Sequence, residues 1–122
     1  MALIGYMEGT NSDLLSKLVA EGHETLPLGN GTDGHGKYIA HLTKSDGVAL
    51  IISYFHKLSP ISGHPSMDVM LSGCQIHNIP VILIVPEDAK SDAESRLEGQ
   101  FDCVYIVSPE EVSGKINEIL NS

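Results

Sequence analysis

The sequence predicts an α/β fold in which a parallel sheet is covered by helices. Two stretches, residues 48–52 and 81–85, are apolar at every position, as strands buried on both faces of a sheet must be. Segments in which apolar residues recur at helical spacing lie before, between and after these stretches. Such an alternation of strands and helices is typical of a parallel α/β sheet.

Length and composition predict one domain, residues 1–122. The chain is 42% hydrophobic and 19% charged, and it is long enough to bury a core without metal or disulfide staples. We therefore expect Cys74 and Cys103 to be reduced core thiols. The net charge of −9 disfavours nucleic acid as a partner, because that surface repels phosphate. Residues 1–7 lack the basic flank of a signal peptide, and no apolar run reaches the ~18 residues of a membrane span, so we expect a cytoplasmic protein without membrane contact.

The first strand is predicted at residues 2–7, and a helix follows it. Asn11 or Ser12 can cap this helix through a side-chain oxygen. The apolar residues then repeat at helical spacing until Gly22, a residue type that commonly ends helices. The segment is therefore one βα unit.

The second strand is predicted at residues 23–28. We expect it at the edge of the sheet, because Pro27 has no N–H to donate to a neighbouring strand. A short helix is predicted from residue 37 to about residue 44, with Ile39 and Leu42 facing inward. The third strand, residues 48–52, is then central.

After a long loop, residues 67–77 have a core-facing stripe of helical spacing that ends before Pro80. The fourth strand covers residues 81–85. A short helix follows, for which Ser91 and Glu94 form a capping-box pattern.

The fifth strand is predicted at residues 101–107, and a complete helix start follows it. Ser108 is the cap, proline comes next, and Glu111 stands three residues after the cap. The buried face of this last helix is expected to consist of Val112, Ile116, Ile119 and Leu120. Five strands alternating with helices predict a three-layer, flavodoxin-like fold with the order 2-1-3-4-5.

The best candidate ligand site lies between the central strand and the next helix. Open parallel sheets bind ligands at the carboxyl ends of their strands, next to the amides of helix starts. Gly63 and its neighbours permit a close backbone approach, and Ser66 can cap the helix beside amides that hold a phosphate or carboxylate. A capped helix without a ligand accounts for the same residues. The predicted ligand-binding residues are Glu8, Asn11, Tyr38, Tyr54, His56, Gly63, His64 and Ser66, and Asp68 is the first candidate for a catalytic acid.

Other motifs have simpler explanations. Residues 29–34 match G-x-G-x-x-G, but they follow a short second strand and not the first, so a turn or a flap is favoured over a dinucleotide site. His35, His56 and His64 leave a metal site open, although loop histidines without a metal are favoured by their loose spacing. We predict neither a metal nor a cofactor.

The layout of residues 2–86 resembles the nucleoside 2-deoxyribosyltransferase family, including its relatives that hydrolyse deoxynucleoside monophosphates. The matching points are Asp46-Gly47-Val48-Ala49, Pro65-Ser66-Met67-x-Val69, Gly73 and Pro80-Val81. The resemblance implies cleavage of an N-glycosidic bond by a pair of acidic residues. Ser72 and Tyr38 stand where the family has those acids, so catalysis is left open.

The sequence therefore predicts a protein that binds a nucleoside, nucleotide or sugar phosphate. Ser66 and the helix amides would hold the anionic group, and Glu8 and Asn11 would face the sugar. The residues that would contact the base are Tyr38, Tyr54 and His56. If the protein is an enzyme, the resemblance implies an N-glycosidase or deoxyribosyltransferase. The alternative is a non-catalytic interaction or regulatory protein that forms a homodimer through residues 67–77, the region through which members of that family assemble.

Overall fold

The computed structural model describes residues 2–7, 10–29, 36–39, 42–54, 72–97 and 103–121. The strands are β1 (Leu3–Met7), β2 (Glu24–Gly29), β3 (Lys37–Tyr38), β4 (Val48–Tyr54), β5 (Val81–Ile84) and β6 (Val104–Val107). The α-helices are α1 (Ser12–Ala20), α4 (Ser72–His77), α5 (Lys90–Leu97) and α6 (Val112–Leu120). Short 3-10 helices include η2 (Lys44–Asp46), η3 (Glu87–Ala89) and η4 (Pro109–Glu111).

The strands form one parallel sheet with the order β3-β2-β1-β4-β5-β6. Its five longer strands have the order 2-1-3-4-5 that the sequence predicts, and β3 adds a two-residue strand beyond β2. β4 lies in the middle, as expected from its apolar sequence, and pairs with β1 on one side and β5 on the other. The chain crosses from one half of the sheet to the other between β1 and β4, which is the topological switch point of the fold.

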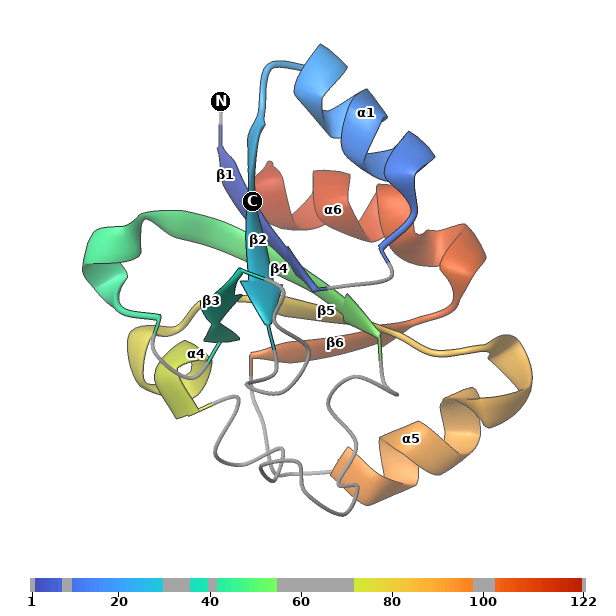
Figure 1. The fold of residues 1–122 in the computed structure, drawn as a ribbon. Coiled ribbons are helices and arrows are strands. Elements are labelled where there is room, and N and C mark those ends of the chain that lie inside the picture. Colours follow the sequence, from blue (N-terminus) through green and yellow to red (C-terminus); the bar gives the residue numbers. More distant parts are fainter. Residues whose placement is uncertain are drawn as a thin grey trace.

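Helices cover both faces of the sheet, and each face has its own buried core (Figure 1). α1 and α6 lie together on one face, where Leu18 and Ile116 pack on Ile52 and other strand residues. α4 and α5 lie on the opposite face, where Cys74 packs with Ile51 and other strand residues. Because successive strand side chains point to opposite faces, the apolar residues of β4 and β5 serve both cores.

Two caps that the sequence predicts are present. Asn11, and not Ser12, is the N-cap of α1, and its Oδ1 accepts hydrogen bonds from the N–H groups of Asp13 (2.7 Å) and Leu14 (3.3 Å). At the start of η4, Ser108 and Glu111 form the reciprocal capping box.

The predicted helix at residues 37–44 is wrong at its start, because Lys37–Tyr38 is the strand β3. The chain turns into β3 at Gly36, whose φ of +70° suits glycine and whose Cβ, if it had one, would lie 2.3 Å from the Pro27 carbonyl oxygen. The predicted edge position of β2 is wrong for the same reason. The nitrogen and the carbonyl of Pro27 point to the same side of the strand, toward Gly36 and away from β1. Pro27 is therefore tolerated, because its missing N–H is not needed for pairing with β1.

The predicted capping role of Ser91 is also wrong, because helical backbone already begins at Glu87 with Pro86 as the cap of η3. Ser91 and Glu94 therefore lie inside α5 and not at the start of the helical segment. The predicted helix at residues 67–77 is described only over α4, and residues 67–71 lie outside the described residues.

Candidate functional site: a pocket between α1 and α6

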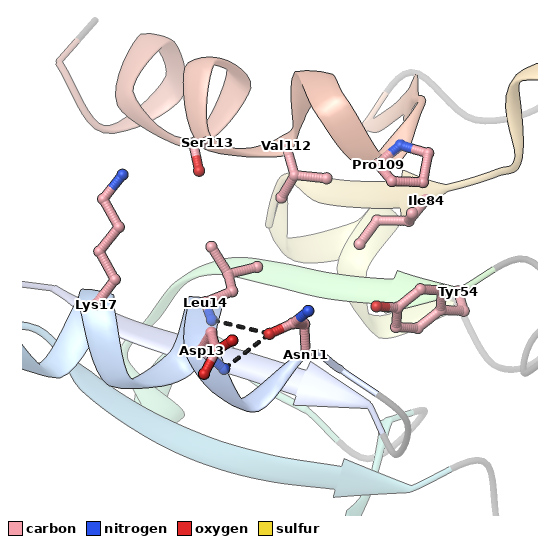
Figure 2. A pocket seen from close by; sticks show the side chains of 9 residues that line it. All are labelled: Asn11, Asp13, Leu14, Lys17, Tyr54, Ile84, Pro109, Val112 and Ser113. Carbon is pink, nitrogen blue, oxygen red and sulfur yellow. Dashed lines mark hydrogen bonds between the residues drawn. The ribbon is translucent and has the colours of Figure 1, made fainter.

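A pocket of about 320 Å³ lies at the carboxyl edge of the sheet, between the first turns of α1 and α6 (Figure 2). Its volume is at the lower end of the range for small-molecule sites. Parallel sheets bind ligands at this edge and near the switch point, which here separates β1 from β4. The pocket is lined by Asn11, Asp13, Leu14, Lys17, Tyr54, Ile84, Pro109, Val112 and Ser113.

The floor of the pocket is apolar. Ile84 at the end of β5 and Val112 at the start of α6 are buried and belong to the core beneath α1 and α6. Leu14 and the ring of Tyr54 pack against the same core from the two sides. Apolar walls with an aromatic side chain are typical of sites that bind a ring-shaped ligand.

The polar side chains stand at the two ends of the pocket. Figure 2 shows Asn11 and the hydroxyl of Tyr54 at one end, and Lys17 and Ser113 at the other. Lys17 rises from α1 toward α6, and Ser113 directs its hydroxyl from α6 toward α1. A narrow crevice continues between the two helices beyond this second end, and Lys17 and Ser113 line it as well.

The first turn of α6 is held in place from the other side of the sheet. Glu111 Oε1 accepts hydrogen bonds from Ser108 N (2.9 Å), Ser108 Oγ (3.0 Å) and Lys90 Nζ (2.8 Å). The bond from Lys90, followed by the two from Ser108, lowers the pKa of Glu111 to about 2. Lys90 belongs to α5, so this carboxylate ties α5 to the segment that carries Pro109 and Val112 into the pocket.

Of the predicted ligand-binding residues, the structure brings Asn11 and Tyr54 into one pocket. Tyr38 lies on β3, which β2 and β1 separate from β4, and only its backbone is described. The remaining predicted residues lie outside the described residues, namely Glu8, His56, Gly63, His64, Ser66 and the candidate acid Asp68. The same holds for His35 and for most of the glycine-rich loop at residues 29–36.

Sequence reasoning missed Lys17 and Ser113, which come from opposite ends of the chain. Asp13, in the first turn of α1, is also absent from the predicted site residues. The predicted strand order could have indicated that these two helices are neighbours, because it places the helices after the first and last strands on the same face of the sheet. Both helices then begin at the carboxyl edge, so their first turns are neighbours.

The described part of the chain contains no group of three or more His, Cys, Asp or Glu side chains placed to hold a metal ion. None of the helices in the described ranges is long and apolar enough to cross a membrane. Comparison of the chain with protein-family models, curated proteins and solved structures gave no match.

Proposed function

We propose that the protein binds a nucleoside-type small molecule in the pocket between α1 and α6. The observation that carries the proposal is the pairing, at the carboxyl edge of a parallel sheet, of an apolar floor and the Tyr54 ring with the polar groups of Asn11 and Asp13. The ring gives a heterocyclic base a flat surface to pack on. Amide and carboxylate side chains donate to and accept from the hydroxyl groups of a sugar.

Asn11 has two separable roles in this proposal. Its Oδ1 caps α1 through Asp13 N and Leu14 N, whereas its Nδ2 is directed into the pocket (Figure 2). Serine caps helices about as well as asparagine but has no amide nitrogen. Asn11→Ser therefore removes the ligand contact and keeps the cap.

The test is a thermal-shift screen against ribo- and deoxyribonucleosides, their 5′-monophosphates and ribose 5-phosphate. A ligand at about a hundred times its Kd adds about 2.7 kcal/mol to the free energy of unfolding, which raises the melting temperature by several degrees. We expect such a rise in the wild type and a smaller one in Asn11→Ser. Asn121→Ser, at the exposed C-cap of α6, is the matched control and should respond as the wild type does.

Turnover is measured in the same incubations, by chromatographic detection of free base. Glycosidases commonly use two carboxylates, and Asp13 is the one carboxylate among the described residues that line the pocket. The prediction from the family resemblance names Asp68 as the other. Base release that is lost in both Asp13→Asn and Asp68→Asn, with ligand-induced stabilisation retained, would support N-glycosidic chemistry.

The alternative function, a non-catalytic homodimer, is favoured by the side chain of Ile76. It lies on α4, within the predicted pairing helix, and is 72% exposed. The same screen separates the two functions. A melting temperature that rises with protein concentration but with none of the small molecules would contradict the ligand proposal and favour the dimer. In either case we propose a cytoplasmic setting, in keeping with the presence of Cys74 and Cys103 as thiols.

A further inference from the structure

The two ends of the pocket differ in charge, and this difference bears on the class of ligand. At the end near β4, the groups are the amide of Asn11 and the hydroxyl of Tyr54. At the other end, Lys17 supplies an ammonium group and Ser113 a hydroxyl. Asp13 lies between them along α1, so a ligand that fills the pocket meets a ring surface, then a hydrogen-bond acceptor and then a cation.

Lys17 is chemically available to a ligand. The other lysines whose side chains are described have partners, because Lys90 pairs with Glu111 at 2.8 Å and Lys115 pairs with Glu118 at 3.3 Å. Lys17 makes no ion pair or side-chain hydrogen bond within the described residues, although Asp13 and Glu21 stand four residues before and after it on α1. Ser113 Oγ likewise has no hydrogen-bond partner in the described part of the chain.

Backbone amides at the two helix starts are largely engaged already. The N–H groups of Asp13 and Leu14 donate to Asn11 Oδ1. At the other helix start, Pro109 has no N–H, and the N–H of Glu111 donates to the carbonyl of Ser108 at 3.0 Å. An anion in the pocket would therefore be held chiefly by the side chains of Lys17 and Ser113 and not by a ring of free amides.

Building on the proposed function, we infer that the ligand is a phosphomonoester whose phosphate binds Lys17 and Ser113. The sugar hydroxyls then lie at Asp13, and the base lies at the end formed by Tyr54 and Asn11. A nucleoside 5′-monophosphate has these three parts in this order. Asp13 sets the orientation, because its carboxylate accepts hydroxyl hydrogens and repels a phosphate. This placement differs from the sequence-based prediction, in which Ser66 holds the anionic group.

The experiment compares the Kd of a nucleoside with the Kd of its 5′-monophosphate by calorimetry, and includes ribose 5-phosphate and inorganic phosphate. Because hydrogen bonds to a charged group are the stronger kind, we expect the monophosphate to bind the wild type about tenfold more tightly than the nucleoside. Lys17→Gln should abolish that preference, so that the monophosphate binds no more tightly than the nucleoside. Ser113→Ala should reduce the preference in part.

Lys115→Gln is the matched control. It removes the same charge from α6, but Lys115 lies over the ring of Tyr105, 5.4 Å from its centroid, and is not among the residues that line the pocket. We expect it to keep the tenfold preference. Ser66→Ala tests the competing placement and should also keep it.

The outcomes separate this inference from the proposed function. Equal affinity for nucleoside and monophosphate, or a preference that survives Lys17→Gln and disappears in Ser66→Ala, would overturn the phosphate placement alone. Inorganic phosphate that binds as tightly as the monophosphate would overturn the assignment of the ligand as a nucleotide, since the base and sugar would then contribute nothing. Absence of binding by every nucleoside and nucleotide would overturn both.

Discussion

The charge of Glu111 helps to hold the segment that carries Pro109 and Val112 into the pocket. Its Oε1 accepts three hydrogen bonds, from Lys90 Nζ, Ser108 N and Ser108 Oγ, and its pKa falls from 4.5 to about 2. A carboxyl whose pKa is lower in the folded than in the unfolded chain stabilises the fold above the unfolded value. This contribution is therefore present above about pH 4.5 and is lost as the pH falls toward 2.

Glu111→Gln should make the stability of the fold less sensitive to acid. Glutamine keeps an acceptor oxygen for Ser108 but carries no charge that protons can remove. We expect the drop in melting temperature between about pH 6 and about pH 3 to be smaller in this variant than in the wild type. Thermal melts followed by circular dichroism measure it. Glu110→Gln removes the same charge from the adjacent exposed residue, and it should keep the wild-type drop. A Glu111→Gln variant with the full wild-type drop would contradict this assignment.

The two partners of Glu111 also show what sequence can and cannot reveal about a residue. Ser108 is three positions away, and its capping box can be predicted from the sequence because the same local spacing recurs at helix starts. Lys90 is 21 positions away and belongs to a helix on the other face of the sheet. The sequence near either residue does not predict that contact, because it depends on how the folded sheet brings α5 and η4 together.

Among the elements, β3 is the one that a short apolar pattern misassigns. Ile39 and Leu42 are three residues apart, and both are buried as predicted. Two buried positions at that spacing fit a longer helix, but they also fit the single turn that follows β3, in which the N–H of Leu42 donates to the carbonyl of Ile39 at 3.2 Å. The decisive interaction is tertiary, because the backbone at Gly36 packs against Pro27 and aligns Lys37–Tyr38 with the end of β2.

Gly36→Ala should therefore destabilise the protein more than an alanine at another glycine of similar conformation. Gly47 is the matched control, because its φ of +72° resembles the +70° of Gly36 and no atom lies within 4 Å of its missing Cβ. Gly47→Ala should cost about 1–2 kcal/mol for the left-handed backbone alone. Gly36→Ala adds a clash with the Pro27 carbonyl, so we expect a loss of more than about 2 kcal/mol. Urea unfolding measures both variants, and equal losses would show that the Gly36–Pro27 contact is unimportant.

At the scale of the whole molecule, the strand order could be predicted because few topologies satisfy two all-apolar strands and a strict alternation with helices. The lining of the pocket could be predicted only in part. Asn11 and Tyr54 follow or end strands, where side chains are expected to face the carboxyl edge. Lys17 lies more than a full turn inside α1, whereas Ser113 is the second residue of α6, and the two are nearly a chain length apart in sequence. Their meeting depends on how α1 and α6 are rotated about their own axes, which the apolar stripes define only loosely.

The core between the sheet and α4 offers a readout of the whole fold through its thiols. Cys74 is fully buried there, and burial, with a smaller contribution from Cys103, raises its pKa to about 12. Cys103 precedes β6, is only partly buried, and donates a hydrogen bond to Gln75 Oε1 at 3.7 Å. Alkylating agents react with the thiolate, so the two residues should differ strongly in reactivity.

We expect iodoacetamide to modify Cys103 in the native protein and to modify Cys74 more than about a hundredfold more slowly. Mass spectrometry of digested samples assigns each adduct, and Cys103→Ser should remove the fast reaction while leaving the slow one. Because Cys74 has no exposed surface, its labelling requires that α4 separate from the sheet. The slow rate should then rise with urea along the unfolding curve if the two faces unfold together, and ahead of it if the α4 face opens by itself. Rapid labelling of Cys74 without denaturant would contradict the burial of this core. If a ligand of the α1–α6 pocket slows Cys74 labelling on the opposite face, the sheet transmits its binding energy to both cores, as expected of strands whose side chains belong to both.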